Sequence, residues 1–163
     1  MSDRILFFGR ENCKHTTNAL NHLKNFDNKL TIILSKSRDD EIPNLINKWE
    51  GEYILCFRSY LILSQNIINK AKIAAINFHP GPPEHPGTGC INFALYNNDK
   101  YYGCTVHLME TTVDSGEILD ICTFPILPDD NVMTLLNRTH ENLYKLFCTF
   151  TTKLFSFNHN YIV

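Results

Sequence analysis

Short apolar runs alternate with amphipathic segments through the first half of the chain. Runs rich in β-branched and aromatic residues predict strands at residues 4–8, 30–34, 53–57 and 73–76. Between these runs, helices are predicted at residues 14–26, from Pro43 to about Trp49, and at residues 65–70, for which Ser64 is a candidate N-cap. This alternation of strand and helix is typical of a parallel sheet with covering helices.

The second half of the chain predicts an antiparallel addition to that sheet. Residues 91–96 predict a short helix, and residues 102–108 and 118–124 predict two strands whose spacing suits an antiparallel pair at one edge. A last helix is expected from about 132 to 150, with a buried stripe of Leu135, Leu136, Leu143, Leu146 and Phe147. We therefore expect an α/β fold with a Rossmann-like, mostly parallel sheet, covering helices and antiparallel edge strands.

Size, charge and cysteine usage narrow the class of protein. A length of 163 residues predicts a single domain over residues 1–163. The formal net charge of -2 supplies no general attraction to nucleic acid or acidic lipid, and no apolar run has the length of a membrane helix. The first residues, MSDRILFFG, lack the features of a signal peptide. The six cysteines are scattered without a C-x-x-C pair, which is typical of reduced thiols. We expect a cytoplasmic monomer or homodimer without nucleic-acid or membrane partners.

Polar side chains that could bind a ligand directly follow the apolar run at 73–76. Asn77 and His79 are two residues apart, so in extended backbone their side chains share a face. Pro80 favours extended backbone at His79, and the prolines and glycines between residues 81 and 89 predict a stiff, irregular loop. Because ligands of open α/β sheets bind at this end of the strands, we expect this amide and imidazole to border a ligand site.

Several motifs around this strand resemble the formyltransferase family that uses 10-formyltetrahydrofolate. They are Asn77-Phe78-His79-Pro80, Pro86-Gly87, Thr105-Val106-His107 and Asp114-Ser115-Gly116. Residues 60–64 are also similar to the loop whose backbone holds the pterin ring in relatives. The resemblance covers about residues 53–125 and implies the formyltransferase fold. Relatives usually carry one more strand–helix unit after the second strand; here only residues 36–52 are available, so we expect that unit to be shortened or absent.

The resemblance implies that Asn77, His79 and Asp114 are catalytic. Formyl transfer to an amine develops negative charge on the formyl oxygen and releases a proton from the nitrogen. Asn77 has N–H groups to donate to that oxygen, and His79 is expected to stabilise the charge as an imidazolium. Asp114 is expected to orient the His79 ring and to raise its pKa. His107 is expected to have a supporting or packing role.

The resemblance also implies where the folate binds and what accepts the formyl group. The folate-binding residues would be Tyr60, Leu61, Ile62, Leu63, Met109, Thr111, Thr112 and Val113. Arg10, which follows the first strand, is the candidate contact for an anionic acceptor. We expect the acceptor to be a primary amine on a small molecule, with a nucleotide-linked amino sugar as the first candidate and glycinamide ribonucleotide as the second.

Three other interpretations remain open at this point. The same three residues would serve a hydrolase that passes the formyl group to water, and the motif would also persist in a non-catalytic folate-binding protein. His79, His85, Cys90 and His107 are the right ligand types for zinc, but their spacing matches no familiar zinc pattern, so we expect no metal.

Overall fold

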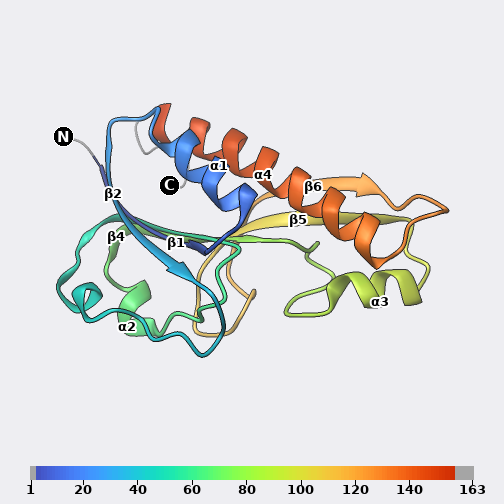
Figure 1. Cartoon of the computed structure of the whole chain (residues 1–163), viewed down its shortest axis with the longest axis horizontal. Coiled ribbons are helices and arrows are strands. Elements are labelled where there is room, and N and C mark those ends of the chain that lie inside the picture. Colours follow the sequence, from blue (N-terminus) through green and yellow to red (C-terminus); the bar gives the residue numbers. More distant parts are fainter. Residues whose placement is uncertain (1–2, 157–163) are drawn as a thin grey trace.

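The computed structural model describes residues 3–156, which form one sheet with the strand order β2-β1-β3-β4-β5-β6 (Figure 1). The strands are β1 (Asp3–Arg10), β2 (Asn28–Ser35), β3 (Gly51–Phe57), β4 (Ala71–His79), β5 (Tyr101–Leu108) and β6 (Ile118–Pro125). The first four strands pair in parallel, whereas β5 is antiparallel to β4 and β6 is antiparallel to β5. The predicted α/β fold with antiparallel strands at one edge is confirmed.

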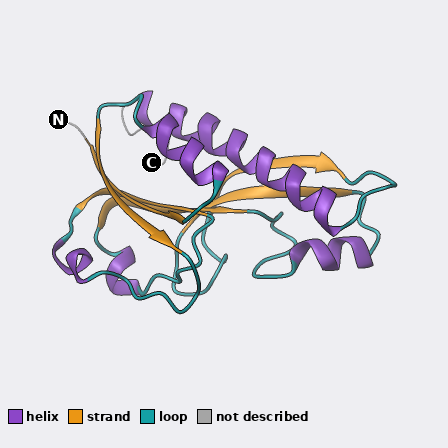
Figure 2. Cartoon of the chain, in the orientation of Figure 1, coloured by secondary structure: helices purple, strands orange, loops and turns teal. Residues whose placement is uncertain are grey.

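Helices cover both faces of the sheet (Figure 2). They are α1 (Lys14–Leu23), the 3₁₀-helix η1 (Asn44–Lys48), α2 (Gln65–Ile68), α3 (Cys90–Tyr96) and α4 (Val132–Ser156). Helices α1 and α4 lie side by side across one face, and η1 and α2 pack on the other (Figure 1). Helix α1 ends before the predicted position, because the Asn28 side-chain amide donates to the Leu23 carbonyl at 2.9 Å. Ser64 precedes α2, but its side chain makes no capping bond in the described structure.

Alternate residues along β1 enter two different core layers. Ile5 and Phe7 pack towards α1 and α4, and Leu6 and Phe8 pack towards η1 and α2. All five residues of the predicted α4 stripe contact the first layer, although Leu136 is only partly buried. The core therefore has the period of two that the sequence pattern predicts for strands.

Phe78 on β4 connects this core to the polar residues beside it. Its ring centroid lies 4.7 Å from that of Phe147 and 5.8 Å from that of Phe150, both on α4. Because neighbouring side chains on a strand point to opposite faces, burying Phe78 under α4 directs Asn77 and His79 to the other face. The packing of α4 thereby fixes the orientation of these two polar residues.

The connection between β2 and β3 is short. Residues 36–50, all of which are described, contain η1 but no strand. This agrees with the expected shortening of one strand–helix unit, and it leaves β2 as an edge strand. Within residues 3–156, no helix has the length and apolar character needed to span a membrane, and all six cysteines are free thiols.

Candidate active site

Strand pairing places the Thr-x-His motif directly beside the Asn-x-His motif. In the antiparallel register of β4 and β5, Asn77 lies opposite His107 and His79 lies opposite Thr105. The Asn77 Nδ2 and His107 Nε2 atoms are 3.1 Å apart. The sequence motifs, about thirty residues apart, thus become neighbours because the chain returns along β5.

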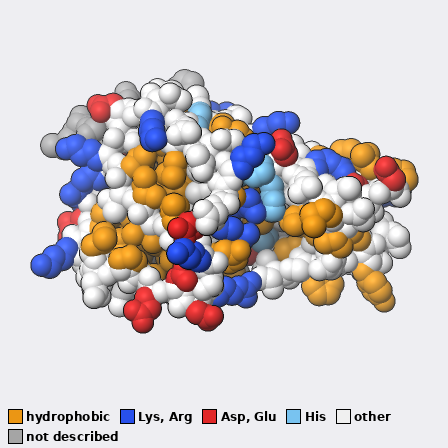
Figure 3. Space-filling model, viewed as in Figure 1, with side chains coloured by type: hydrophobic (Ala, Val, Ile, Leu, Met, Phe, Trp, Pro, Cys, Tyr) orange, Lys and Arg blue, Asp and Glu red, His pale blue; other side chains and the backbone are white. Residues whose placement is uncertain are grey.

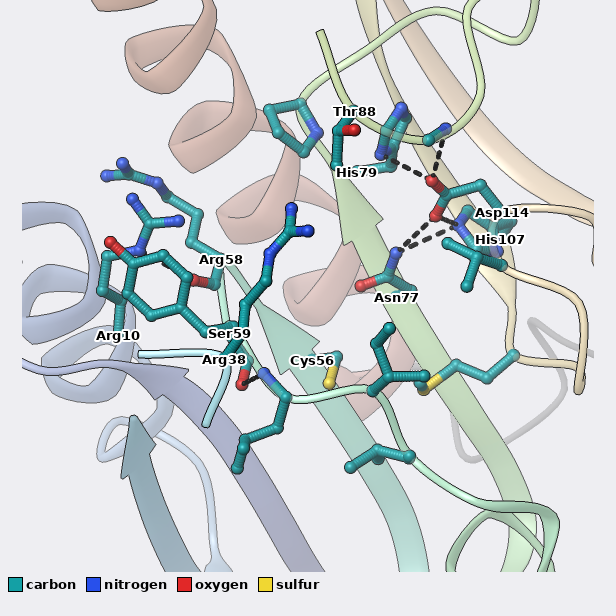
Figure 4. A pocket seen from close by; sticks show the side chains of 18 of the residues that line it. Arg10, Arg38, Cys56, Arg58, Ser59, Asn77, His79, Thr88, His107 and Asp114 are labelled. Atoms are coloured by element: carbon teal, nitrogen blue, oxygen red, sulfur yellow. Dashed lines mark hydrogen bonds and ion pairs between the residues drawn. The ribbon is translucent and has the colours of Figure 1, made fainter. Parts of the chain in front are cut away.

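Asp114 is the centre of the polar cluster and reaches it from the loop between β5 and β6 (Figure 4). Its Oδ1 atom lies 3.1 Å from Asn77 Nδ2 and 3.2 Å from His107 Nε2. Its Oδ2 atom lies 3.2 Å from His79 Nδ1 and accepts the Gly87 N–H at 2.9 Å. These four partners use the carboxylate's roughly four acceptor positions. The Asp114 side chain is only 8% exposed, so its orientation is fixed by these contacts.

The pKa values of Asp114 and His107 move in the directions of an ion pair. Burial alone would raise the pKa of Asp114, but the His107 hydrogen bond, the charge of His79 and the Gly87 N–H lower it in total. Burial alone would lower the pKa of His107, but its bonds to Asp114 and to the Leu108 carbonyl raise it overall. Since the Leu108 carbonyl can only accept, at 2.8 Å, His107 Nδ1 carries a proton, and the second proton on Nε2 faces Asp114.

His79 behaves differently from the expectation. Burial lowers the pKa of His79, and this effect outweighs the raising effects of Asp114 and the His85 carbonyl; His107 lowers it further. Asp114 does raise the pKa of His79, but the net shift is downward, so the prediction of a raised pKa for His79 is wrong. The physical reason is the burial of the ring, and the charge of His107, which also contacts Asp114, adds a smaller effect in the same direction. A neutral His79 then donates Nδ1–H to the carboxylate, the stronger acceptor, and its Nε2 carries the lone pair that can take up a proton.

A hydrogen-bond acceptor lies beside His79 Nε2. The His85 carbonyl oxygen lies 3.2 Å from Nε2, and Cys90 Sγ lies 3.8 Å from the same atom. Once Nε2 gains a proton it can donate to that carbonyl, so the imidazolium would have a partner at each nitrogen. An imidazole held in this way can change its protonation state without losing its orientation.

Asn77 has one N–H available for a ligand when His107 is doubly protonated. One Nδ2 hydrogen goes to Asp114, and a protonated His107 cannot accept the other. Figure 4 shows the amide nitrogen of Asn77 directed towards Asp114 and its oxygen on the opposite side. Sequence reasoning placed His107 in a supporting role; the structure adds that its charge determines whether the second Asn77 hydrogen is free.

A cavity of about 420 Å³ opens beside this cluster. Seven of the predicted folate-binding residues border it, together with Arg10: Tyr60, Leu61, Ile62, Leu63, Met109, Thr111 and Val113. Thr112 does not line it, and its carbonyl instead accepts the Ser115 hydroxyl at 3.0 Å. On the face of the molecule that Figure 3 shows, basic and histidine side chains gather near the middle.

Three basic lining residues were not selected from the sequence: Arg38, Arg58 and His140. Arg58 directly follows β3 and could have been suspected, because polar residues at the carboxyl ends of parallel strands meet at one edge. His140 comes from α4, and only the tertiary structure brings it to the cavity.

The possible zinc ligands have other partners. His85 Nε2 lies 2.7 Å from Asp99 Oδ2, and His107 is bonded to Asp114 and the Leu108 carbonyl. Among residues 3–156, no group of three or more His, Cys, Asp or Glu side chains is arranged to hold a metal ion.

The raised pKa of His107 gives a prediction for stability. A folded-state pKa above the unfolded value near 6.5 stabilises the protein below pH 6.5, and this contribution is lost as pH rises through the folded value. We expect His107→Asn to remove this loss, so that the gap in unfolding free energy between wild type and variant narrows above pH 6.5. Urea unfolding at several pH values measures it; a gap that is constant from pH 6 to 9 would contradict the ion pair.

Comparisons with known proteins agree with this fold. A family model described as formyl transferase matches residues 7–151. The trifunctional purine biosynthetic protein adenosine-3 of Drosophila melanogaster is 33% identical over 90 residues, which is 54% of this chain and 7% of that protein. The matched segments cover between 6% and 56% of the length of such curated relatives.

Two solved structures share the fold. The phosphoribosylglycinamide formyltransferase of Bacillus halodurans has a TM-score of 0.78 at 14% identity, over 98% of this chain and 100% of that chain. An N-formyltransferase from Helicobacter canadensis, in complex with folinic acid and dTDP-3-aminofucose, also has a TM-score of 0.78, at 19% identity, over 93% of this chain and 64% of that chain. Because the family model spans most of the sequence, the chain belongs to the formyl transferase family.

Proposed function

We propose that this chain transfers a formyl group from 10-formyltetrahydrofolate to a primary amine on a small molecule. The observation that carries the proposal is the arrangement around Asp114. One buried carboxylate joins Asn77, His79 and His107 at the wall of a cavity bordered by the two predicted folate loops. Family membership supports the same chemistry.

The side chains have distinct roles in this reaction. The bound folate supplies a formyl group that an amine can attack. The second Nδ2 hydrogen of Asn77 donates to the formyl oxygen as negative charge develops, and one such donor is worth roughly 3 kcal/mol in the barrier. His79 Nε2 accepts the proton released by the amine, and the His85 carbonyl then receives a hydrogen bond from it. Asp114 stabilises the resulting imidazolium through Nδ1. As the bond between the formyl carbon and the donor nitrogen breaks, the same proton returns to that nitrogen, so that tetrahydrofolate leaves as the neutral amine.

The cavity suits a flat, partly apolar ring. Ile62 and Val113, on opposite loops, are 71% and 51% exposed, which leaves apolar surface for a ligand to cover. Leu61 and Leu63 are buried beside Ile62 and anchor the first loop in the core. The cavity volume also falls within the usual range for small-molecule pockets. The pterin would lie between residues 60–63 and 109–113, held largely by backbone groups.

Ile62 provides a test of this folate position. Ile62→Ala should raise the KM for 10-formyltetrahydrofolate by about 10-fold through lost apolar contact, with kcat little changed. Ile32→Ala is the matched control, because Ile32 lies on the edge strand β2 and is 43% exposed. Steady-state kinetics with the folate as varied substrate give the answer. Equal KM values for both variants and wild type would place the folate elsewhere.

The identity of the amine acceptor is the finer part of the proposal. A nucleotide-linked amino sugar is our first candidate, supported by the Helicobacter canadensis enzyme, whose structure contains dTDP-3-aminofucose. Glycinamide ribonucleotide is the second, supported by the Bacillus halodurans enzyme, whose whole length this chain covers.

One assay separates the activities. The protein is incubated with 10-formyltetrahydrofolate and a panel of amines, folate turnover is followed by absorbance, and formylated products are identified by mass spectrometry. Formylation of one amine, abolished in Asn77→Ala, supports the proposal. Formate release that is independent of any amine indicates a hydrolase, and folate binding without turnover indicates a non-catalytic protein; both results would overturn it.

A further inference from the structure

A second group of charged side chains lines the wall of the cavity opposite Asp114. Figure 4 shows Arg10, Arg38 and Arg58 together on one side, across from Asn77 and Asp114. Arg10 ends β1 and Arg58 directly follows β3, and these strands are parallel neighbours in the sheet. The topology therefore brings the two arginines to the same edge, while Arg38 is contributed by the connection after β2.

This basic wall has no carboxylate to balance it. Within residues 3–156, none of the three arginines forms an ion pair with Asp or Glu. Glu11, the residue next to Arg10, lies 3.4 Å from Lys36 instead. Arg58 Nη1 meets only weak partners, namely Cys13 Sγ at 3.0 Å and His15 Nδ1 at 3.5 Å. Arg10 donates its Nε–H to the Arg58 carbonyl and lies 3.9 Å from the Tyr60 ring centroid.

The positive charge of the arginines contributes to the lowered pKa values of two neighbouring histidines. Burial lowers the pKa of His140 to about 3, and Arg58, His15 and Arg10 contribute to that shift. Burial and then Arg58 lower the pKa of His15 as well. Positive charges that suppress the protonation of their neighbours would be stabilised by an anion among them.

The backbone of Arg58 has an unusual conformation for a residue with a side chain. Its φ angle is 57°, in the left-handed region that glycine adopts most easily. A residue with a side chain is less favourable there than glycine. The Arg10 Nε–H bond to the Arg58 carbonyl helps to hold this conformation. Strain of this kind persists where the surrounding structure fixes it, and it is concentrated at ligand sites.

We propose that Arg10 and Arg58, with Arg38 at the rim, bind a phosphoryl group of the acceptor. Guanidinium groups match phosphate oxygens with paired hydrogen bonds, and an anion here would replace the thiol and imidazole contacts of Arg58. The acceptor would then span the cavity, with its phosphoryl group on the arginine wall and its amine beside Asn77 and His79. The anion site stands on the geometry alone; its assignment to the acceptor rests on the proposed formyl transfer.

The test measures binding of inorganic phosphate and pyrophosphate without any folate, by calorimetry and by the shift in melting temperature at constant ionic strength. Arg58→Gly removes the charge and relieves the left-handed strain, so we expect it to fold at least as stably as wild type. Arg10→Met removes the second guanidinium. The matched control is Arg4→Met, because Arg4 is exposed at the opposite end of the same strand.

We expect wild type and Arg4→Met to bind pyrophosphate equally, and Arg10→Met and Arg58→Gly to bind it roughly 10- to 100-fold more weakly. Phosphate binding as tightly as pyrophosphate would indicate a monophosphate acceptor, and tighter pyrophosphate binding would indicate a diphosphate-linked one. Equal binding by all four proteins, or no binding by wild type, overturns the subsite. Formyl transfer to an uncharged amine without pyrophosphate binding would reject the subsite only. Pyrophosphate binding without transfer to any amine would reject the proposed function only.

Discussion

Replacing Asn77, His79 or Asp114 with Ala should each lower turnover by at least about 10²-fold while the protein remains folded. Asn77→Ala removes the donor to the formyl oxygen, and His79→Ala removes the base that takes the amine proton. Asp114→Ala should have the largest effect, because Asp114 contacts both other residues as well as His107. The double variants should lose little more than the worse single variant, since the residues act as one unit.

Asp114→Asn sharpens this prediction. All four groups around the carboxylate are donors: the Asn77 amide, the two histidine N–H groups and the Gly87 N–H. An amide of the same shape has only one accepting oxygen and presents two N–H groups of its own, so about half of those donors lose their partner. We expect Asp114→Asn to be nearly as inactive as Asp114→Ala, despite its similar volume.

Asn92→Ala is the control for the alanine series, because Asn92 is an exposed residue of α3 outside the cavity. Circular dichroism and melting temperatures establish that each variant is folded, and single-turnover kinetics separate the chemical step from folate binding. A folded variant of Asn77, His79 or Asp114 that retains near-wild-type turnover would exclude that residue from the mechanism.

The fold was predictable from the sequence because its strands are short and rich in apolar residues, and the central ones are buried. Four parallel strands carry β-branched and aromatic runs, and most expected element boundaries lie within a few residues of those in the structure. Departures occur at helix ends, where a periodic pattern does not encode the presence or absence of a single side-chain bond. Helix α1 ends early because Asn28 caps the Leu23 carbonyl, and Ser64 starts α2 without a side-chain cap.

The grouping of Asn77, His79 and Asp114 came partly from spacing and partly from family resemblance. A period of two places Asn77 and His79 on one face, and the burial of Phe78 below α4 determines which face that is. The position of Asp114 relative to β4 depends on the loop between β5 and β6. Asp114 has a left-handed backbone conformation in that loop, which no periodicity in the sequence predicts. Gly116 in the same loop fits because a Cβ there would lie 1.9 Å from the Leu108 carbonyl oxygen.

The charge states could not be derived from the sequence. The expectation for His79 considered Asp114 as its partner, but the structure shows that Asp114 is shared with His107. Burial then lowers the pKa of His79 overall, and the burial of the ring depends on the whole fold. The sequence predicted Arg10 as an anion contact, but only the pairing of β1 with β3 shows that Arg58 lies beside it.

Gly81→Ala should inactivate the enzyme almost as strongly as the loss of His79, by displacing its ring. A Cβ at residue 81 would lie 2.5 Å from His79 Nε2 and 3.2 Å from the His85 carbonyl oxygen. The His79 ring cannot move away without breaking its contact with Asp114. The loop is also held in place, because the Gly81 carbonyl accepts a hydrogen bond from the Thr105 hydroxyl at 2.7 Å. A shift of about 1 Å in a catalytic group can cost on the order of 10²-fold in rate.

Glu84→Ala is the control for Gly81→Ala, because Glu84 is exposed in the same loop and its truncation adds no atom near the ring. The readouts are kcat, melting temperature and the NMR signals of the His79 ring, assigned with His79→Asn. We expect Gly81→Ala to shift the His79 signals and to lose roughly 10- to 100-fold in kcat at a temperature where it is fully folded. A folded Gly81→Ala protein with unshifted His79 signals and normal kcat would show that the ring does not depend on this close approach. In that case the His85 carbonyl would not be the partner of Nε2 during turnover.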